Sequence, residues 1–243
     1  MMISVPASAG TYCDSCQRLN QNINVSDYKI TAASVAHNKK WGQLEFEIIV
    51  EGQAGRSVSK PAGKMNGAPV DGYVFPTTLS SEDIGFSKTD GIVALALTAH
   101  PDFDDTPLWD ENGDGDYAND KVVWHPHWVI LVEDKRVAGN LSVKQFDPGD
   151  KSVVLPKTNP GMPMYMDSPG FQVVTQGKAI RVVVPDYRVR FKTNFRYDAV
   201  GAYMQLATGS DGSHDAAGKM PMLGVYKVYS VLSKNLSLPY QVK

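Results

Sequence analysis

This 243-residue chain lacks the features that mark several large classes of protein. It contains only two cysteines, so a zinc site built from two cysteine pairs is excluded. Its formal net charge of −2 provides no general attraction to nucleic acid or to an anionic membrane. No apolar run approaches the about 18 residues that a membrane-spanning helix needs. The chain also has no Gly-x-Ser-x-Gly elbow, phosphate-binding glycine loop or dinucleotide fingerprint, so no catalytic class is indicated.

The two cysteines form a single pair, Cys13 and Cys16, in a tail predicted to span residues 1–24. Covalent haem attachment is excluded because the residue after Cys16 is Gln17 instead of histidine. A redox couple and half of a zinc site remain alternatives. A local disulfide is the favoured interpretation, because no strand–turn–helix pattern surrounds the pair, and it implies an oxidising compartment.

Residues 7–9 (Ala-Ser-Ala) resemble the small-residue end of a secretory signal, but residues 1–6 supply neither a basic region nor an adequate apolar stretch. A trimmed export sequence and an ordinary polar tail are both consistent with this pattern. Together with the predicted disulfide, it favours a periplasmic or extracellular protein. Three glycosylation-type triplets begin at Asn24, Asn140 and Asn235, but such triplets are common by chance.

Strand patterns dominate the remainder of the chain. Residues 44–50 alternate apolar and polar side chains with period two, whereas no stretch of 12 residues has helical periodicity. With 21 glycines and 15 prolines punctuating the chain, we predict an all-β protein with one large β-sandwich domain over residues 25–243. Its long irregular loop excursions are expected at residues 52–69, 100–121 and 147–167. The predicted strands are residues 28–35, 44–50, 72–75, 91–98, 122–132, 179–185, 187–191, 202–206 and 224–232.

One acidic segment has the pattern of a calcium loop. Asp110, Asn112 and Asp114 alternate before a glycine that permits a sharp turn, and this start resembles the calcium loop of EF-hands. It departs from that family at position twelve, which is Lys121, and a strand pattern follows where a helix would be expected. The predicted calcium ligands are Asp110, Asn112, Asp114, Asp116 and Asp120. A solvated turn without an ion is the alternative, because Asp, Asn and Gly favour turns.

Two histidines follow this segment. In a strand, His125 and His127 point to the same face, while Trp124, Pro126 and Trp128 point to the other. Two imidazoles on one face suit Zn²⁺, Cu²⁺ or Fe²⁺ if another strand supplies a further ligand. Histidines that only make structural hydrogen bonds are the alternative, and Pro126 could bulge the strand. The candidates for this second metal site, either separate from the calcium site or joined to it, are His100, Asp102, Asp104, Asp105, His125 and His127.

Methionines and aromatic residues have two interpretations each. Alternating thioethers can bind Cu(I), or one can be an axial haem ligand, but core packing is the favoured role for methionine. The methionines concerned are Met162, Met164, Met166, Met220 and Met222. The aromatic residues near the acidic segment could stack on a sugar, but burial in the core is favoured. They are Trp109, Tyr117, Trp124 and Trp128.

The segment from Val25 to His37, a short polar turn, and the segment from Leu44 to Ile48 together resemble the first strand pair of DOMON-type and related carbohydrate-binding β-sandwiches. The resemblance covers about 25 residues and rests on pattern. It implies an exported ligand-binding domain whose ligand is a haem or a sugar. Met164 and His127 would be the candidate haem ligands.

Three functions follow from these patterns. The first is an exported, non-catalytic β-sandwich module that binds calcium and a small-molecule or carbohydrate ligand. The second is a haem- or copper-binding protein for electron transfer or metal handling, using His125, His127 and a methionine. The third is a metal-dependent hydrolase in which a metal at His125 and His127 activates water, and this requires at least three converging protein ligands.

Overall fold

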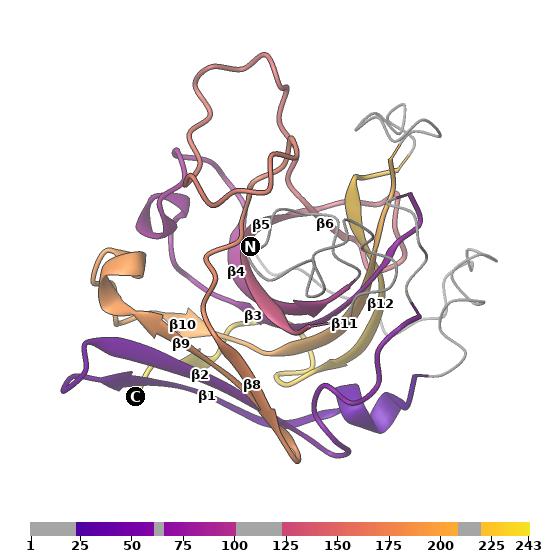
Figure 1. Ribbon diagram of the computed structural model, residues 1–243, viewed down its shortest axis with the longest axis vertical. Coiled ribbons are helices and arrows are strands. Elements are labelled where there is room, and N and C mark those ends of the chain that lie inside the picture. Colours follow the sequence, from indigo (N-terminus) through magenta and orange to yellow (C-terminus); the bar gives the residue numbers. More distant parts are fainter. Residues whose placement is uncertain (1–22, 61–65, 101–122, 209–219) are drawn as a thin grey trace, which may run out of the picture.

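The computed structural model describes residues 23–60, 66–100, 123–208 and 220–243 (Figure 1). The predicted all-β class is confirmed. The helical elements among these residues are 3-10 turns of four residues each: η1 (Val25–Tyr28), η2 (Ser81–Ile84) and η3 (Asp186–Val189). In the described part of the chain, no helix is long and apolar enough to cross a membrane.

The main sheet closes into a six-stranded barrel, so the predicted β-sandwich is wrong. Strand order is β4-β3-β11-β12-β6-β5-β7, and β4 also pairs with β5, which joins the two ends of the sheet. β7 pairs with Trp128 and Val129 of β5, next to the β6 pairing at Leu131–Glu133, so it extends the same side of the barrel wall. The bounds are β3 (Pro69–Pro76), β4 (Ile92–Ala99), β5 (His125–Glu133), β6 (Leu141–Val143), β7 (Met166–Asp167), β11 (Val200–Leu206) and β12 (Leu223–Val231). Alternation along one strand shows that a face is buried, but closure depends on pairing between strands far apart in sequence.

A second sheet covers one side of the barrel (Figure 1). Its antiparallel order is β1-β2-β9-β8. Apolar residues of β2 and β9 pack against the outer face of β3, β4 and β5, where the Phe46 ring meets those of Phe75 and Trp128 at centroid distances of 5.2 and 6.4 Å. The bounds are β1 (Ile30–Asn38), β2 (Gln43–Val50), β8 (Val173–Gln176) and β9 (Ala179–Pro185), and a small separate pair joins β10 (Arg196–Tyr197) to β13 (Tyr240–Gln241).

Most predicted strands are present, and the alternation over residues 44–50 gives β2 one buried face, as expected. The strand predicted at residues 187–191 is wrong. Pro185 ends β9 and η3 follows, with Arg190 and Phe191 at φ 48° and 60°. Val189 is buried there, whereas Tyr187 and Phe191 are exposed. The apparent alternation of these residues therefore came from a turn whose side chains face different ways.

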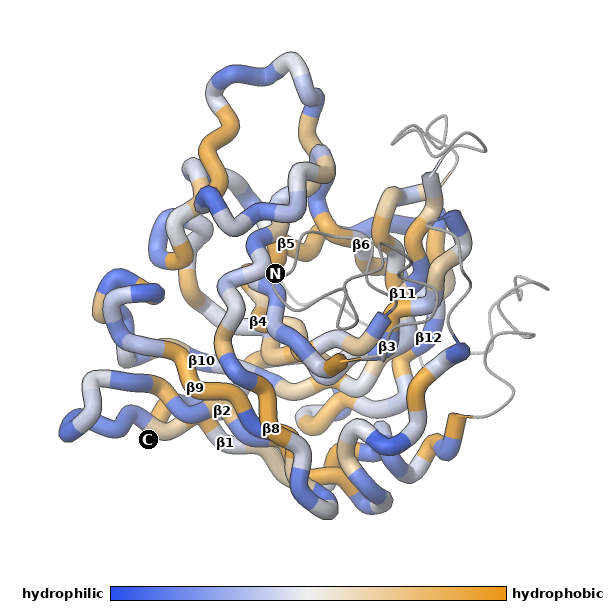
Figure 2. Tube along the Cα trace, viewed as in Figure 1, coloured by the Kyte–Doolittle hydropathy of each residue, from blue (hydrophilic) through white to orange (hydrophobic). Residues whose placement is uncertain are grey.

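The barrel has its own apolar core, distinct from the core between barrel and second sheet. Valine, alanine, leucine and methionine side chains from the barrel strands point inward. β3, β4 and β11 are buried along both faces, whereas the second half of β12 is only partly buried. Along the tube, hydrophobic segments concentrate in the strands and hydrophilic ones in the connecting turns (Figure 2). The inner core ends at a group of histidines where β4 ends and β5 begins.

Candidate metal centre

Three histidines meet at one end of the barrel because β4 and β5 are neighbours. Thr98 pairs with His125 and Ala96 with His127, while His100 directly follows the end of β4. Side chains alternate along each strand, so His100, His125 and His127 all belong to the inner face. The register of β5 against β4 is continuous across Pro126, so this residue does not bulge the strand. The predicted shared face of His125 and His127 is confirmed.

The ring nitrogens of the three histidines converge. His100 Nε2 lies 2.8 Å from His125 Nε2 and 3.4 Å from His127 Nε2. One ligand atom from each residue falls within 4.8 Å of the others. For a tetrahedral ion with metal–nitrogen bonds of about 2.0–2.1 Å, the nitrogens should be about 3.4 Å apart. Side-chain shifts of about one ångström would bring the trio to that geometry.

Hydrogen bonds at the opposite ring nitrogens favour the tautomer that a metal needs. His125 Nδ1 lies 2.8 Å from the carbonyl oxygen of Val123, which can only accept, so Nδ1 carries the proton. His127 Nδ1 lies 3.0 Å from Ser168 Oγ, which accepts a hydrogen bond from Nδ1–H when Nε2 is the ligand. Such partners orient a metal-binding imidazole and fix its tautomer. The two rings are therefore held with Nε2 toward the centre of the cluster.

A proton and a metal ion compete for this cluster. Two Nε2 atoms 2.8 Å apart make a hydrogen bond only if one of them carries a proton. A metal ion can replace that proton, since it accepts a lone pair from each nitrogen. His100 is 6% exposed and His127 2%, so a shared proton or an ion here is largely shielded from water.

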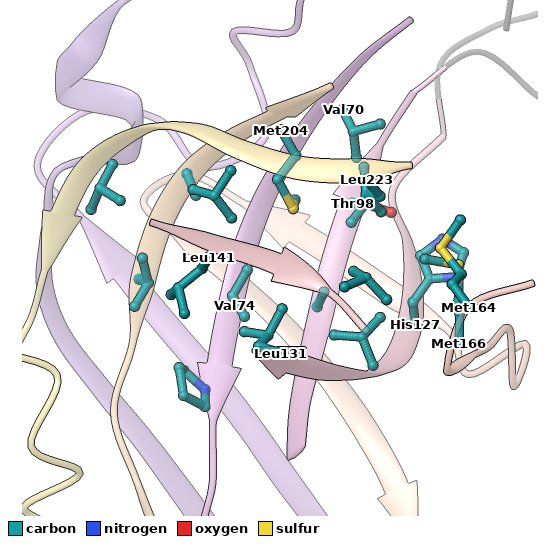
Figure 3. A pocket seen from close by; sticks show the side chains of 18 of the residues that line it. Val70, Val74, Thr98, His127, Leu131, Leu141, Met164, Met166, Met204 and Leu223 are labelled. Carbon is teal, nitrogen blue, oxygen red and sulfur yellow. The ribbon is translucent and has the colours of Figure 1, made fainter. Parts of the chain in front are cut away.

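The histidines close one end of a small cavity inside the barrel. The cavity has a volume of about 50 Å³ and is lined by the apolar inner face, with His100, His127 and Thr98 as its polar lining residues. Met164 and Met166 line it beside His127 (Figure 3). Among the described residues, no carboxylate lines this cavity. The available ligands are thus nitrogen and sulfur atoms, which suit zinc and copper better than calcium or magnesium.

Ser168 reaches His127 because β7 pairs with β5. Trp128 pairs with Asp167 and the Ser168 amide donates to Thr158 O at 2.9 Å, which fixes the backbone beside the histidine. The neighbouring Asp167 carboxylate is fully buried and accepts a hydrogen bond from Thr158 Oγ1 at 2.5 Å. Burial raises the pKa of Asp167, against the lowering effects of Thr158 and Arg188. The Asp167 side chain lies on the face of β7 opposite to Met166, which lines the cavity.

Replacing Ser168 with alanine should weaken metal binding by about tenfold, because the hydroxyl that orients His127 is lost. The affinity for Zn²⁺ can be measured by competition with a chromophoric chelator. Ser168→Thr keeps a hydroxyl and should recover most of the affinity. Equal affinities in wild type and Ser168→Ala would show that the contact does not position the ring.

The structure gathers some of the predicted site residues and leaves others undescribed. His100, His125 and His127 come together. The remaining predicted ligands lie outside the described residues: Asp102, Asp104, Asp105, Asp110, Asn112, Asp114, Asp116 and Asp120. Cys13 and Cys16 also lie outside them, as do Trp109 and Tyr117. The calcium loop and the disulfide therefore stay predictions.

The described aromatic and methionine residues of the sequence analysis lie in or against the core. Trp128 lies in the core and is 1% exposed, and Trp124 is partly buried against the same core. Trp124 Nε1 donates a hydrogen bond to Gly55 O at 3.1 Å. Both positions agree with the favoured core role. Met162, Met164 and Met166 are buried, as expected, but they line the cavity that the histidines close. Sequence reasoning missed Ser168. Its only signal was its place two residues after Met166 in an alternating stripe.

Comparisons with protein-family models, with curated proteins and with solved structures find no match to this chain, so the geometry of the site carries the functional argument alone.

Proposed function

We propose that this protein binds one transition-metal ion through His100, His125 and His127, and that its role is to hold or hand on that ion. The observation that carries the proposal is the convergence of one ring nitrogen from each histidine within 4.8 Å, with Nδ1 of two rings fixed by oxygen partners. Three imidazoles that face one another suit a shared cation.

A bare ion fits this site better than a haem. Pockets for drug-sized ligands and cofactors have volumes of about 300–1,000 Å³. The cavity beside the histidines measures about 50 Å³. Met164 and His127, the haem ligands that the DOMON resemblance implied, both line this cavity, which is smaller than the pocket that a haem requires. We therefore assign these residues to an ion.

Metal binding is also better supported than hydrolysis. The three imidazoles supply the ligands that a water-activating metal requires. A substrate would also need space and an acid or base near the ion. The cavity is small and apolar, and its lining has no carboxylate among the residues that the structure describes. These features favour an ion kept away from substrates.

The calcium site and export remain separate proposals. Both rest on sequence patterns in residues 1–22 and 101–122, which lie outside the described residues. Calcium at Asp110, Asn112, Asp114, Asp116 and Asp120 would use oxygen ligands, whereas the histidine site uses nitrogen. The two sites should therefore be distinguishable by their metal preference.

The proposal is tested by titrating metal-free protein with Zn²⁺ and with Co²⁺, and by elemental analysis after dialysis. We expect roughly one equivalent of either ion, and a visible spectrum of tetrahedral Co²⁺ type. Calcium found in the same preparation would belong to the acidic segment and should be removed by a calcium chelator without loss of zinc. Failure to bind Zn²⁺, Co²⁺ or Cu⁺ at micromolar protein concentration would refute the proposal.

A further inference from the structure

Sulfur atoms lie next to the histidine cluster. Met162, Met164 and Met166 alternate along the chain and are at most 5% exposed. All three line the same cavity as His100 and His127. The three thioethers therefore face the cavity, whereas the intervening Tyr165 packs in the core between the barrel and the second sheet.

The strand register places Met166 close to His127. Met166 pairs with Val129 across β7 and β5, and both side chains face the barrel interior. His127 is two residues from Val129 on the same face of β5, so it is the diagonal neighbour of Met166. Diagonal neighbours are about 7–8 Å apart at the backbone, which long side chains can span.

The side-chain view supports this placement. Met164 and Met166 lie together beside the ring of His127, and their sulfur atoms are on the side of that ring (Figure 3). Met204 also lines the cavity, but its sulfur lies over another part of the barrel, away from His127. Thioethers are therefore gathered at the histidines and are not only spread through the core.

We propose that the metal is Cu(I), and that Met164 or Met166 completes its coordination beside the three imidazoles. This inference rests on the proposed function and names its ion. Thioethers are soft ligands that select Cu(I), whereas zinc sites use cysteine, histidine and carboxylate. Methionine therefore gives this site a preference that histidine alone would not provide.

Burial reinforces the choice of a monovalent ion. Imidazole and thioether ligands are neutral, so the full charge of the ion stays in the site. The cost of transferring an ion into a low-dielectric interior rises with the square of its charge, so it is about fourfold higher for Zn²⁺ than for Cu⁺.

The test compares Cu(I) and Zn²⁺ affinities of the full chain carrying Met164→Leu and Met166→Leu together. Leucine conserves most of the volume, so packing changes little. We expect the Cu(I) dissociation constant to rise by about tenfold or more while the Zn²⁺ constant changes by less than about twofold. X-ray absorption of the Cu(I) form should show a sulfur neighbour that the double variant lacks.

Met204→Leu is the matched control, because it removes a cavity thioether that lies away from His127. It should leave both affinities unchanged. Wild type that binds zinc and copper, with Cu(I) affinity unaltered in the double variant, would overturn the copper inference and leave the histidine site intact. Wild type that binds neither ion would instead refute the proposed function itself.

Discussion

Replacing His125 with alanine should reduce zinc and copper affinity by at least about 100-fold, because a direct ligand matters more than its hydrogen-bond partner. His125 is the most suitable of the three for this change, since it is only partly buried and its loss disturbs the core least. His100→Ala and His127→Ala should have similar effects on binding.

A thermal shift gives the second measurement of the same prediction. An ion present at about 100 times its dissociation constant stabilises the folded state by about 2.7 kcal/mol. For a domain of this size, that corresponds to a rise in Tm of about 5–10 °C. The wild type should show this rise with zinc, and the His125→Ala variant should not.

His37 supplies the matched control for both measurements. It is the remaining histidine in the described part of the chain, and it lies in β1 of the second sheet. Its Nε2 lies 2.8 Å from Oδ2 of Asp186, which is in η3. His37→Gln should bind metal as the wild type does. If His125→Ala folds normally and still binds zinc with wild-type affinity, the three-histidine site is wrong.

Asp71 should make the protein less stable as the pH rises from about 4 to about 6. Its carboxylate is 1% exposed on the outer face of β3. Oδ2 accepts the Ser59 amide at 2.6 Å, whereas Oδ1 has no hydrogen-bond partner among the described residues. Burial raises the pKa of Asp71 to about 6, against the lowering effect of the Ser59 bonds.

The direction of this pH dependence follows from the number of protons bound by the folded and unfolded states. In the unfolded chain an aspartate has a pKa of about 3.9, so between about pH 4 and pH 6 the unfolded state binds fewer protons than the folded state. The contribution of Asp71 to the free energy of unfolding therefore falls through this range and is constant above it. A difference of about two pKa units corresponds to about 3 kcal/mol.

Asp71→Asn should remove this loss of stability with rising pH. Urea unfolding of the metal-free wild type and variant at several pH values gives the measurement. The variant's stability relative to wild type should increase by about 3 kcal/mol between pH 4 and pH 7.5. Asp150→Asn, at an exposed turn, should follow the wild type above about pH 5. Parallel stability curves for wild type and Asp71→Asn would contradict the prediction.

The sequence was informative where a local pattern decides the outcome. Apolar alternation in residues 44–50 predicted β2 and the all-β class, because side-chain direction has period two in any strand. The spacing of His125 and His127 likewise predicted a shared face. By contrast, residues 187–191 show that a short alternation can come from a turn.

By itself, the sequence determined which residues form strands, and which two histidines share one face, because these depend only on neighbours along the chain. Only the tertiary structure decided that the sheet closes into a barrel and that His100 joins His125 and His127, since both depend on the pairing of β4 with β5. The positions of Ser168 and Met166 beside His127 depend likewise on the pairing of β7 with β5. Such pairings join residues about 25 to 40 positions apart, and their register is set by packing of the whole barrel, which no local pattern encodes.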